Sequence, residues 1–205
     1  MKIKVCGMKY PENIRELAHL PIDMMGLIFY EKSPRYAGNL PASELRFVPP
    51  NIQKVGVFVN ASAEDIVAVI REYDLQIVQL HGDESPDFCR EIKKQGIKVI
   101  KAFPIEKITD FEKCNLYENA CDYFLFDTKT SQYGGSGKKF DWGILALYNS
   151  ETPFILSGGV NVEDAESIRK IRHPKLYGVD LNSRFETRAG EKDLEKLRGF
   201  CLVFR

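Results

Sequence analysis

Residues 122–142 read DYFLFDTKTSQYGGSGKKFDW, and this stretch predicts a buried strand, an acid at its end and a glycine-rich loop. The apolar and aromatic run at 123–126 is typical of a short strand that is covered on both faces. Asp127 follows the run directly. Asp141 is a suitable N-cap for a helix over 142–147, whose dipole would then point at the loop. The stretch therefore indicates one unit of an α/β fold with a polar site after its strand.

The segment at 128–139 has no apolar periodicity and contains three glycines. Gly134, Gly135 and Gly137 free the backbone to bring several N–H groups close to an anion. Glycines alone more often mark a flexible surface connection, although a long polar loop in a compact chain is more often functional than idle. The Walker pattern is absent, because Lys139 stands where Ser or Thr would bind magnesium. The loop therefore favours an anion site and excludes an NTPase loop.

The composition is that of one ordinary globular domain spanning residues 1–205, with 44% hydrophobic and 28% charged residues. Lys plus Arg and Asp plus Glu both number 29, so no basic excess points to nucleic acid or to an anionic membrane surface. We therefore expect a small molecule as the partner. A monomer and a homodimer are both left open.

The five cysteines are scattered and lack the short paired spacings of zinc or dithiol sites, which fits a reducing compartment. The N-terminus lacks the apolar run of a secretory signal, and no segment approaches the roughly 18 apolar residues of a membrane span. We therefore expect a soluble, cytoplasmic protein.

Eight apolar runs that indicate strands alternate with eight segments that indicate helices. The strands are expected at 3–6, 24–29, 55–59, 77–80, 99–103, 123–126, 154–156 and 176–179. The helices are expected from Pro11, from about Ala42, at 63–73 after the N-cap Ser62, from Ser85-Pro86 to Gly96, and at 111–117, 142–147, 162–171 and 194–203. Strict alternation implies parallel strands joined by right-handed crossovers.

Polar residues and glycines directly follow six of the eight expected strands. The positions of these six strand ends decide between an open and a closed sheet. In an open sheet, at about 4.8 Å per strand, these ends would spread over roughly 30 Å, which is too far for one small ligand. A closed (β/α)₈ barrel brings every carboxyl end to one mouth, where barrel enzymes keep their sites. The sequence therefore predicts an α/β fold, a single (β/α)₈ TIM barrel with parallel strands.

Cys6 ends the first expected strand and Asp127 the sixth, so both would face the mouth of the barrel. Taken alone, Cys6 is more often a small buried hydrophobe and Asp127 a loop-capping carboxylate. Together they supply a base and an acid. A thiol with a pKa near about 8.5, modestly lowered by its surroundings, can accept a proton from carbon, and a partly desolvated carboxylic acid can donate one. The pair indicates an isomerisation without metal or cofactor.

Three loops at neighbouring barrel positions predict a phosphate site. Ser157-Gly158-Gly159 follows the seventh expected strand, and Asp180-Leu181-Asn182-Ser183 follows the eighth. Both loops would lie next to Gly135-Ser136-Gly137-Lys138 after the sixth strand, where barrels frequently bind phosphate. A plain turn is the commoner meaning of each motif alone, so the expectation depends on their combination.

Two further side chains are candidates at the mouth. Arg35, in the long loop after the second expected strand, could bind a substrate carboxylate with a bidentate fork, or it could be a solvated surface arginine. His81 could line the pocket, or its imidazole could stabilise a turn. No arrangement such as H-E-x-x-H supports a metal site.

With these residues in place, the chain resembles the phosphoribosylanthranilate isomerase family of barrel enzymes over essentially its whole length. The resemblance is carried, in chain order, by Lys4-Val5-Cys6-Gly7-Met8, Ser33-Pro34-Arg35, Gln79-Leu80-His81-Gly82, Asp127, residues 134–142 (GGSGKKFDW), Leu156-Ser157-Gly158-Gly159 and Gly178-Val179-Asp180. In that order and at those strand ends, the set is much more specific than any one motif.

The resemblance implies an Amadori rearrangement of N-(5-phosphoribosyl)anthranilate in tryptophan synthesis. It assigns Asp127 to protonate the furanose ring oxygen, Cys6 to remove the C2 proton, and Arg35 to hold the anthranilate carboxylate. The phosphate would rest on backbone N–H groups around Gly135, Gly137, Gly158, Gly159 and Ser183.

One departure from the family pattern lies after the eighth expected strand. The family usually reads Ser-Ser-Gly-Val-Glu there, whereas this chain reads NSRFE at 182–186. Arg184 therefore brings a Cβ to a position near the phosphate where the family has glycine, and it could add a charge contact.

Two alternatives stay open. Another phosphate-binding barrel enzyme, such as the isomerase of histidine synthesis or indole-glycerol-phosphate synthase, would use an acidic pair or a catalytic lysine at strand ends. A noncatalytic sensor barrel would keep the glycine loops without needing both Cys6 and Asp127.

Overall fold

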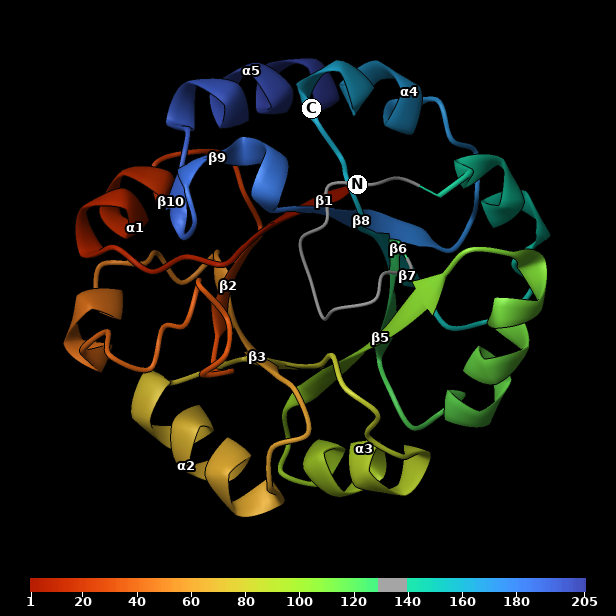
Figure 1. Cartoon of the computed structure of the whole chain (residues 1–205), viewed down its shortest axis with the longest axis horizontal. Helices are drawn as coiled ribbons and strands as arrows, with labels where there is room; N and C mark the ends of the chain where they lie inside the picture. Colours follow the sequence, from red (N-terminus) through yellow and green to blue (C-terminus); the bar gives the residue numbers. More distant parts are fainter. Residues whose placement is uncertain (129–139) are drawn as a thin grey trace.

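The eight apolar runs form the eight parallel strands of a closed barrel, and the helices surround them (Figure 1). The computed structural model describes residues 1–128 and 140–205. The barrel strands are β1 (Lys2–Cys6), β2 (Met24–Ile28), β3 (Gln53–Phe58), β4 (Ile77–Leu80), β5 (Lys98–Ile105), β6 (Tyr123–Thr128), β7 (Phe154–Leu156) and β8 (Leu176–Leu181). The prediction of a (β/α)₈ barrel is confirmed.

Pairing between the first and last strands closes the barrel, with Lys4 opposite Asp180. Because successive residues of a strand point to opposite faces, two residues that are paired in a parallel register share one face. One face of the sheet forms a small apolar core inside the barrel, made by Met24, Val55, Ile77, Ile100, Ala102, Leu125 and Ile155. The other face packs against the helices and forms the larger core. Polar residues at the interior positions of the carboxyl ends therefore converge on one opening.

The outer layer contains fewer α-helical residues than the sequence predicts. Its elements are α1 (Pro11–Leu17), η1 (Ala42–Leu45), α2 (Ala63–Tyr73), α3 (Pro86–Lys93), η2 (Ile108–Tyr117), η3 (Trp142–Leu147), η4 (Val162–Asp164), α4 (Ala165–Arg169), η5 (Ser183–Phe185) and α5 (Leu194–Phe204), where η marks a 3-10 helix. The helices expected at 111–117 and 142–147 are 3-10 helices, and the one at 162–171 divides into η4 and α4.

The side-chain caps explain this difference. Ser62 and Ser85 each accept a hydrogen bond from the backbone N–H three residues on, as an α-helix requires, and the predicted N-cap Ser62 is confirmed. Asp141 instead accepts from the N–H of Gly143, only two residues on, at 2.8 Å. A turn this tight favours a 3-10 helix, because it closes before a full α-helical turn can form.

A short hairpin follows the eighth barrel strand and was not predicted. It consists of β9 (Glu186–Arg188) and β10 (Glu191–Lys192), and it lies beside α1 (Figure 1). The Asn13 side chain of α1 bonds both backbone groups of Lys192, accepting from its N–H at 2.7 Å and donating to its carbonyl at 2.9 Å. The hairpin is therefore fixed to the barrel and does not move as a free loop.

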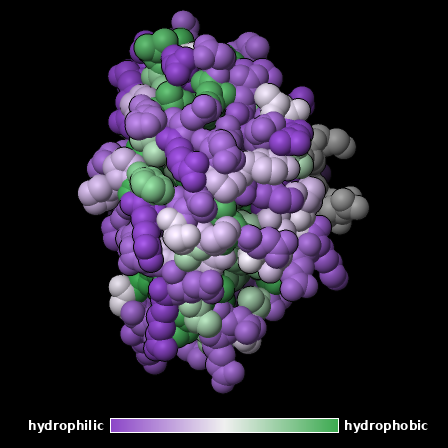
Figure 2. All heavy atoms as spheres, turned by 90° about the vertical axis from the view of Figure 1, so that its left-hand side faces the viewer, coloured by the Kyte–Doolittle hydropathy of each residue, from purple (hydrophilic) through white to green (hydrophobic). Residues whose placement is uncertain are grey.

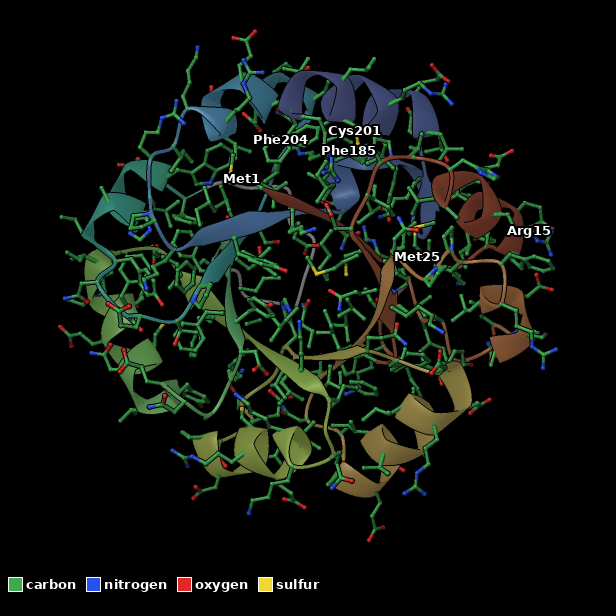
Figure 3. The ribbon with its side chains drawn as sticks, turned by 180° about the vertical axis from the view of Figure 1, so that it is seen from behind. Met1, Arg15, Met25, Phe185, Cys201 and Phe204 are labelled. Atoms are coloured by element: carbon green, nitrogen blue, oxygen red, sulfur yellow. The ribbon has the colours of Figure 1, made fainter. Side chains whose placement is uncertain are left out.

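The outer surface is mostly hydrophilic on the face shown in Figure 2, where hydrophobic residues form small separate groups. Seen from behind, Phe185 and Cys201 lie between α5 and the strands, while Arg15 points outward from α1 (Figure 3). Within the described ranges, no helix combines the length and the apolar composition that crossing a membrane requires.

Candidate active site

A cavity of about 330 Å³ opens at the carboxyl ends of the barrel strands. The predicted site residues that line it are Cys6, Arg35, His81, Asp127, Ser157, Gly158, Gly159, Asp180, Asn182 and Ser183. The predicted residues Gly135, Gly137 and Lys138 lie outside the described part of the chain. Closing the sheet therefore brings every described candidate to one opening, including Cys6 and Asp127, which are 121 positions apart in the numbering.

Asp127 is the last residue but one of β6, which ends at Thr128, so it lies at the end of the sixth strand as predicted. Its Oδ1 accepts the N–H of Thr128 at 2.8 Å. Burial raises the pKa of Asp127 to about 6, because desolvation disfavours the carboxylate more strongly than the Thr128 hydrogen bond favours it. This agrees with the expectation of a partly desolvated acid.

Cys6 is buried at the end of β1, with 3% of its surface exposed. Burial raises the pKa of its thiol above the ordinary 9.0, although the Lys4 ammonium acts in the opposite direction. The expectation of a modestly lowered pKa was therefore wrong, because removing water from a thiolate disfavours the anion more than nearby cations favour it. At neutral pH, Cys6 rests as a thiol.

His81 connects to Asp127 through its ring. Its Nε2 lies 3.6 Å from Asp127 Oδ2, and its Nδ1 lies 2.9 Å from Gln79 Nε2. Burial, aided by nearby lysines, lowers the pKa of His81 to about 4, so the imidazole is neutral at pH 7. Since an amide nitrogen only donates, Nδ1 accepts and the ring proton lies on Nε2, toward Asp127. His81 is therefore a hydrogen-bond donor in the cavity and not a cation.

Gln79 is a site residue that the sequence reasoning did not select. It is 1% exposed, it lines the cavity, and its Oε1 has no hydrogen-bond partner in the described part of the chain. A buried amide oxygen without a partner is unfavourable, so a ligand hydroxyl is a suitable donor for it. The signal available in the sequence was its position in the fourth strand, two residues before His81, which puts both side chains on one side of an extended segment.

Arg35 is held in a defined orientation at the rim of the cavity. Its Nε donates to Glu186 Oε1 at 2.9 Å and its Nη2 to Glu186 Oε2 at 2.7 Å. Lys192 supports the same carboxylate with an Nζ to Oε1 distance of 2.7 Å. Nη1 of Arg35 makes no hydrogen bond to described residues, so one edge of the guanidinium stays open. Arg35 is therefore not a solvated surface side chain, and its partner Glu186 lies in the hairpin that was not predicted.

Asp180 does not belong to a phosphate-binding loop, and that expectation was wrong. It lies within β8, because the pairing with β1 runs through Leu181, and its side chain points into the barrel. Its Oδ1 accepts from Lys4 Nζ at 2.9 Å, and both side chains are almost fully buried. A carboxylate there would repel a phosphate, so its partner is the lysine. The sequence analysis named Lys4 only as part of the motif at residues 4–8.

Backbone N–H groups of the loops after β7 and β8 remain for an anion. Those of Gly158, Gly159 and Ser183 donate no hydrogen bond within the described residues, and all three residues line the cavity. At Gly158 φ is +87°, and a Cβ would lie 2.6 Å from the backbone nitrogen of Thr128, so only glycine fits. Arg184 lies in η5 and is not among the residues with positive φ, so its Cβ is accommodated.

No group of three or more His, Cys, Asp and Glu side chains within residues 1–128 and 140–205 is placed to hold a metal ion. The side chains that line the cavity include two carboxyls, a thiol, an imidazole, two amides and a guanidinium. Such a set can transfer protons and bind an anionic ligand that also carries hydroxyl groups.

Comparison with known proteins gives consistent matches along the whole chain. Residues 3–202 match the family model described as N-(5'-phosphoribosyl)anthranilate (PRA) isomerase. A protein of that name from Parabacteroides distasonis is 52% identical over 204 residues, covering 98% of this chain and 91% of the relative.

Solved structures agree with the family match. The phosphoribosyl anthranilate isomerase of Thermotoga maritima superposes with a TM-score of 0.86 at 34% identity, covering 100% of this chain and 98% of that one. A phosphoribosyl anthranilate isomerase in complex with reduced 1-(o-carboxyphenylamino)-1-deoxyribulose 5-phosphate superposes with a TM-score of 0.82 at 31% identity, with the same coverage.

Proposed function

Since this chain belongs to the N-(5'-phosphoribosyl)anthranilate isomerase family, we propose that it isomerises N-(5-phosphoribosyl)anthranilate by cofactor-independent general acid–base catalysis. The product is 1-(2-carboxyphenylamino)-1-deoxyribulose 5-phosphate, and the reaction is a step of tryptophan synthesis in the cytoplasm. The observation that carries the proposal is the convergence of Cys6 and Asp127 on one cavity, beside backbone N–H groups that donate to no group in the described part of the chain.

Asp127 acts first, as the general acid. Its proton passes to the ring oxygen of the furanose, the bond from that oxygen to C1 breaks, and the nitrogen lone pair forms an iminium ion. A pKa of about 6 suits this step, because the acid form is populated near neutral pH and the proton is still released readily. The neutral His81 then donates to the carboxylate that remains, and so limits the charge left in a buried site.

Cys6 acts second, as the general base. Its thiolate takes the proton from C2, the electrons of that C–H bond form the C1–C2 double bond, and the iminium nitrogen becomes neutral. The resulting enolamine tautomerises to the ketone. The positive charge of the iminium makes the C2 proton more acidic, so a soft, weakly hydrated base at this position is sufficient.

The two ends of the substrate have separate partners in this proposal. The open edge of Arg35 receives the anthranilate carboxylate in a charge-assisted pair, while Glu186 holds the opposite edge. The apolar wall of Ile28, Val57 and Val59 takes the aryl ring. At the other side, the N–H groups of the loops after β7 and β8 bind the phosphate.

The test is the loss of phosphoribosylanthranilate fluorescence when the purified protein is added without metal or nucleotide. We expect rapid loss with the wild-type protein and a loss slower by about 10² to 10⁴ with Cys6→Ala or Asp127→Asn. Near-normal turnover by either variant would reject the role of that residue. No turnover by a folded wild-type protein would reject the function.

A further inference from the structure

A buried ion pair lies below the cavity and is not used by the two proton transfers. Lys4 Nζ is 2.9 Å from Asp180 Oδ1, and the two side chains are 0% and 5% exposed. The second oxygen of Asp180 accepts from Ser157 Oγ at 3.3 Å. A buried ion pair of this kind often stabilises a fold no better than two apolar side chains of similar volume. Its presence beside a reactive group therefore suggests a chemical role.

The ammonium of Lys4 and the thiol of Cys6 share one pocket inside the barrel. The two residues alternate along β1, so they face the same side of the strand. Gly26 of β2 pairs with Cys6, and a Cβ on Gly26 would lie 2.8 Å from Cys6 Sγ and 3.2 Å from Lys4 Nζ. Any side chain at position 26 would displace both groups. The glycine thus leaves room for the thiol and the ammonium to lie close together.

We propose that Lys4, held in place by Asp180, is a positioning residue that stabilises the thiolate of Cys6. The thiolate is the form that accepts the C2 proton, so the consequence for turnover rests on the proposed function. Lys4 keeps its own proton throughout, and the proton taken from C2 ends on Cys6 Sγ. The role of Lys4 is electrostatic, because a cation favours a neighbouring anion most strongly where water is excluded.

Charged groups reach Cys6 from several elements. Lys4 comes from β1, Asp180 from β8, Lys192 from β10 and Arg35 from the loop after β2, while Asp127 and His81 line the same cavity. Among the charges, Lys4 lowers the pKa of the Cys6 thiol most, and Asp180 raises it. Lys192 and Arg35 bind the carboxylate of Glu186, whereas Lys4 faces the same side of β1 as Cys6 and borders the same space over Gly26. Lys4 is therefore the cation best placed to act on the thiol.

The experiment measures the rate at which iodoacetamide alkylates Cys6 between pH 6 and pH 10, followed by mass spectrometry of the peptide that contains it. We expect Lys4→Met to slow alkylation at pH 8 by about tenfold or more and to raise the midpoint of the pH profile. Asp180→Asn should lower the midpoint, because it leaves the ammonium unopposed. Lys4→Arg should keep the midpoint near that of the wild type.

Two further variants separate charge from folding. The double variant Lys4→Met with Asp180→Asn buries no unpaired charge, and we expect it to fold with its midpoint raised and its kcat/KM lowered about tenfold. Lys2→Met is the matched control, since Lys2 lies on the same strand and pairs with Asp23 at 2.7 Å on the surface. It should leave the Cys6 midpoint unchanged.

A folded double variant with the wild-type midpoint and wild-type turnover would overturn the proposal, because it would show that the pair serves packing alone. The alkylation rate needs no substrate. A wild-type protein that lacks isomerase activity would therefore count against the proposed function and would leave this test of Lys4 in force.

Discussion

The dependence of kcat/KM on pH is the strongest prediction. Catalysis requires the group with the lower pKa to be protonated while the group with the higher pKa is ionised. Catalysis needs Asp127 protonated and Cys6 ionised, yet the pKa of Asp127 is about 6 and that of Cys6 is raised above 9.0. Below pH 6 the acid is fully protonated and the thiolate falls tenfold per unit. Above pH 6 the loss of protonated Asp127 cancels the gain in thiolate.

The expected profile therefore rises with a slope of one up to about pH 6 and is flat from there to the raised pKa of the Cys6 thiol. Because the pKa of the Cys6 thiol lies above that of the Asp127 carboxyl, only a small fraction of the free enzyme holds both groups in the active form. A neighbour such as Lys4 that brings the pKa of Cys6 one unit closer to that of Asp127 raises the plateau of kcat/KM about tenfold.

The assay is the initial rate of substrate fluorescence loss at low substrate concentration from pH 5 to pH 9.5, since kcat/KM reports the free enzyme. A decline above pH 6 would show that the thiolate is not required, and a continuous rise to pH 9 would show that protonated Asp127 is not required. The substrate phosphate also titrates near pH 6, at about its second pKa. Asp127→Asn controls for it, because the slope of one should continue above pH 6 in this variant, and a break near pH 6 that persists belongs to the phosphate.

Three further predictions test the surroundings of the site. Glu186→Gln weakens the hydrogen bonds that orient the Arg35 guanidinium, so KM should rise about tenfold or more with kcat nearly unchanged. Glu191→Gln in the same hairpin should change neither constant. Equal KM values for the two variants would contradict the contact between Arg35 and the substrate carboxylate. Ionising Asp127 opposes folding as the pH rises from its ordinary pKa of 3.8 through about 6, so Asp127→Asn should gain about 2 kcal/mol relative to wild type between pH 4.5 and pH 8 in urea titrations. A difference that does not vary with pH would mean that the carboxyl is not desolvated. Gly158→Ala should lose more unfolding free energy than Gly96→Ala, which also has positive φ but has open space around its Cβ; the latter should lose about 1 kcal/mol, and equal losses would remove the argument from close approach.

The strands could be predicted from the sequence because short apolar runs bounded by polar turns leave few alternatives. The errors lie at strand ends. The strand expected at 99–103 continues through Pro104, which pairs with Asp127 of β6. The extended pairing places Asp127 within a strand. The side chain still faces the interior, as predicted, because the alternation of faces does not depend on where the strand ends.

The ion pairs of the site could not be predicted, because each joins residues far apart in the chain. Lys4 meets Asp180 only when β8 closes on β1, and Arg35 meets Glu186 only through a polar hairpin without any apolar periodicity. Local propensity carries no signal for such a hairpin, since its tertiary hydrogen bonds to α1 hold it in place. Cys6 and Asp127 were predicted because each stands at the end of a short, mostly apolar run.

The direct measurement of the central claim uses N-(5-phosphoribosyl)anthranilate carrying deuterium at C2 of the sugar. We predict that the wild-type protein forms product more slowly from this substrate than from the unlabelled one and releases the deuterium to water, whereas Cys6→Ala and Asp127→Asn do neither at a comparable rate. If Cys6→Ala released the deuterium as fast as the wild type, a thiol and a carboxyl acting across one cavity would not be the catalytic pair.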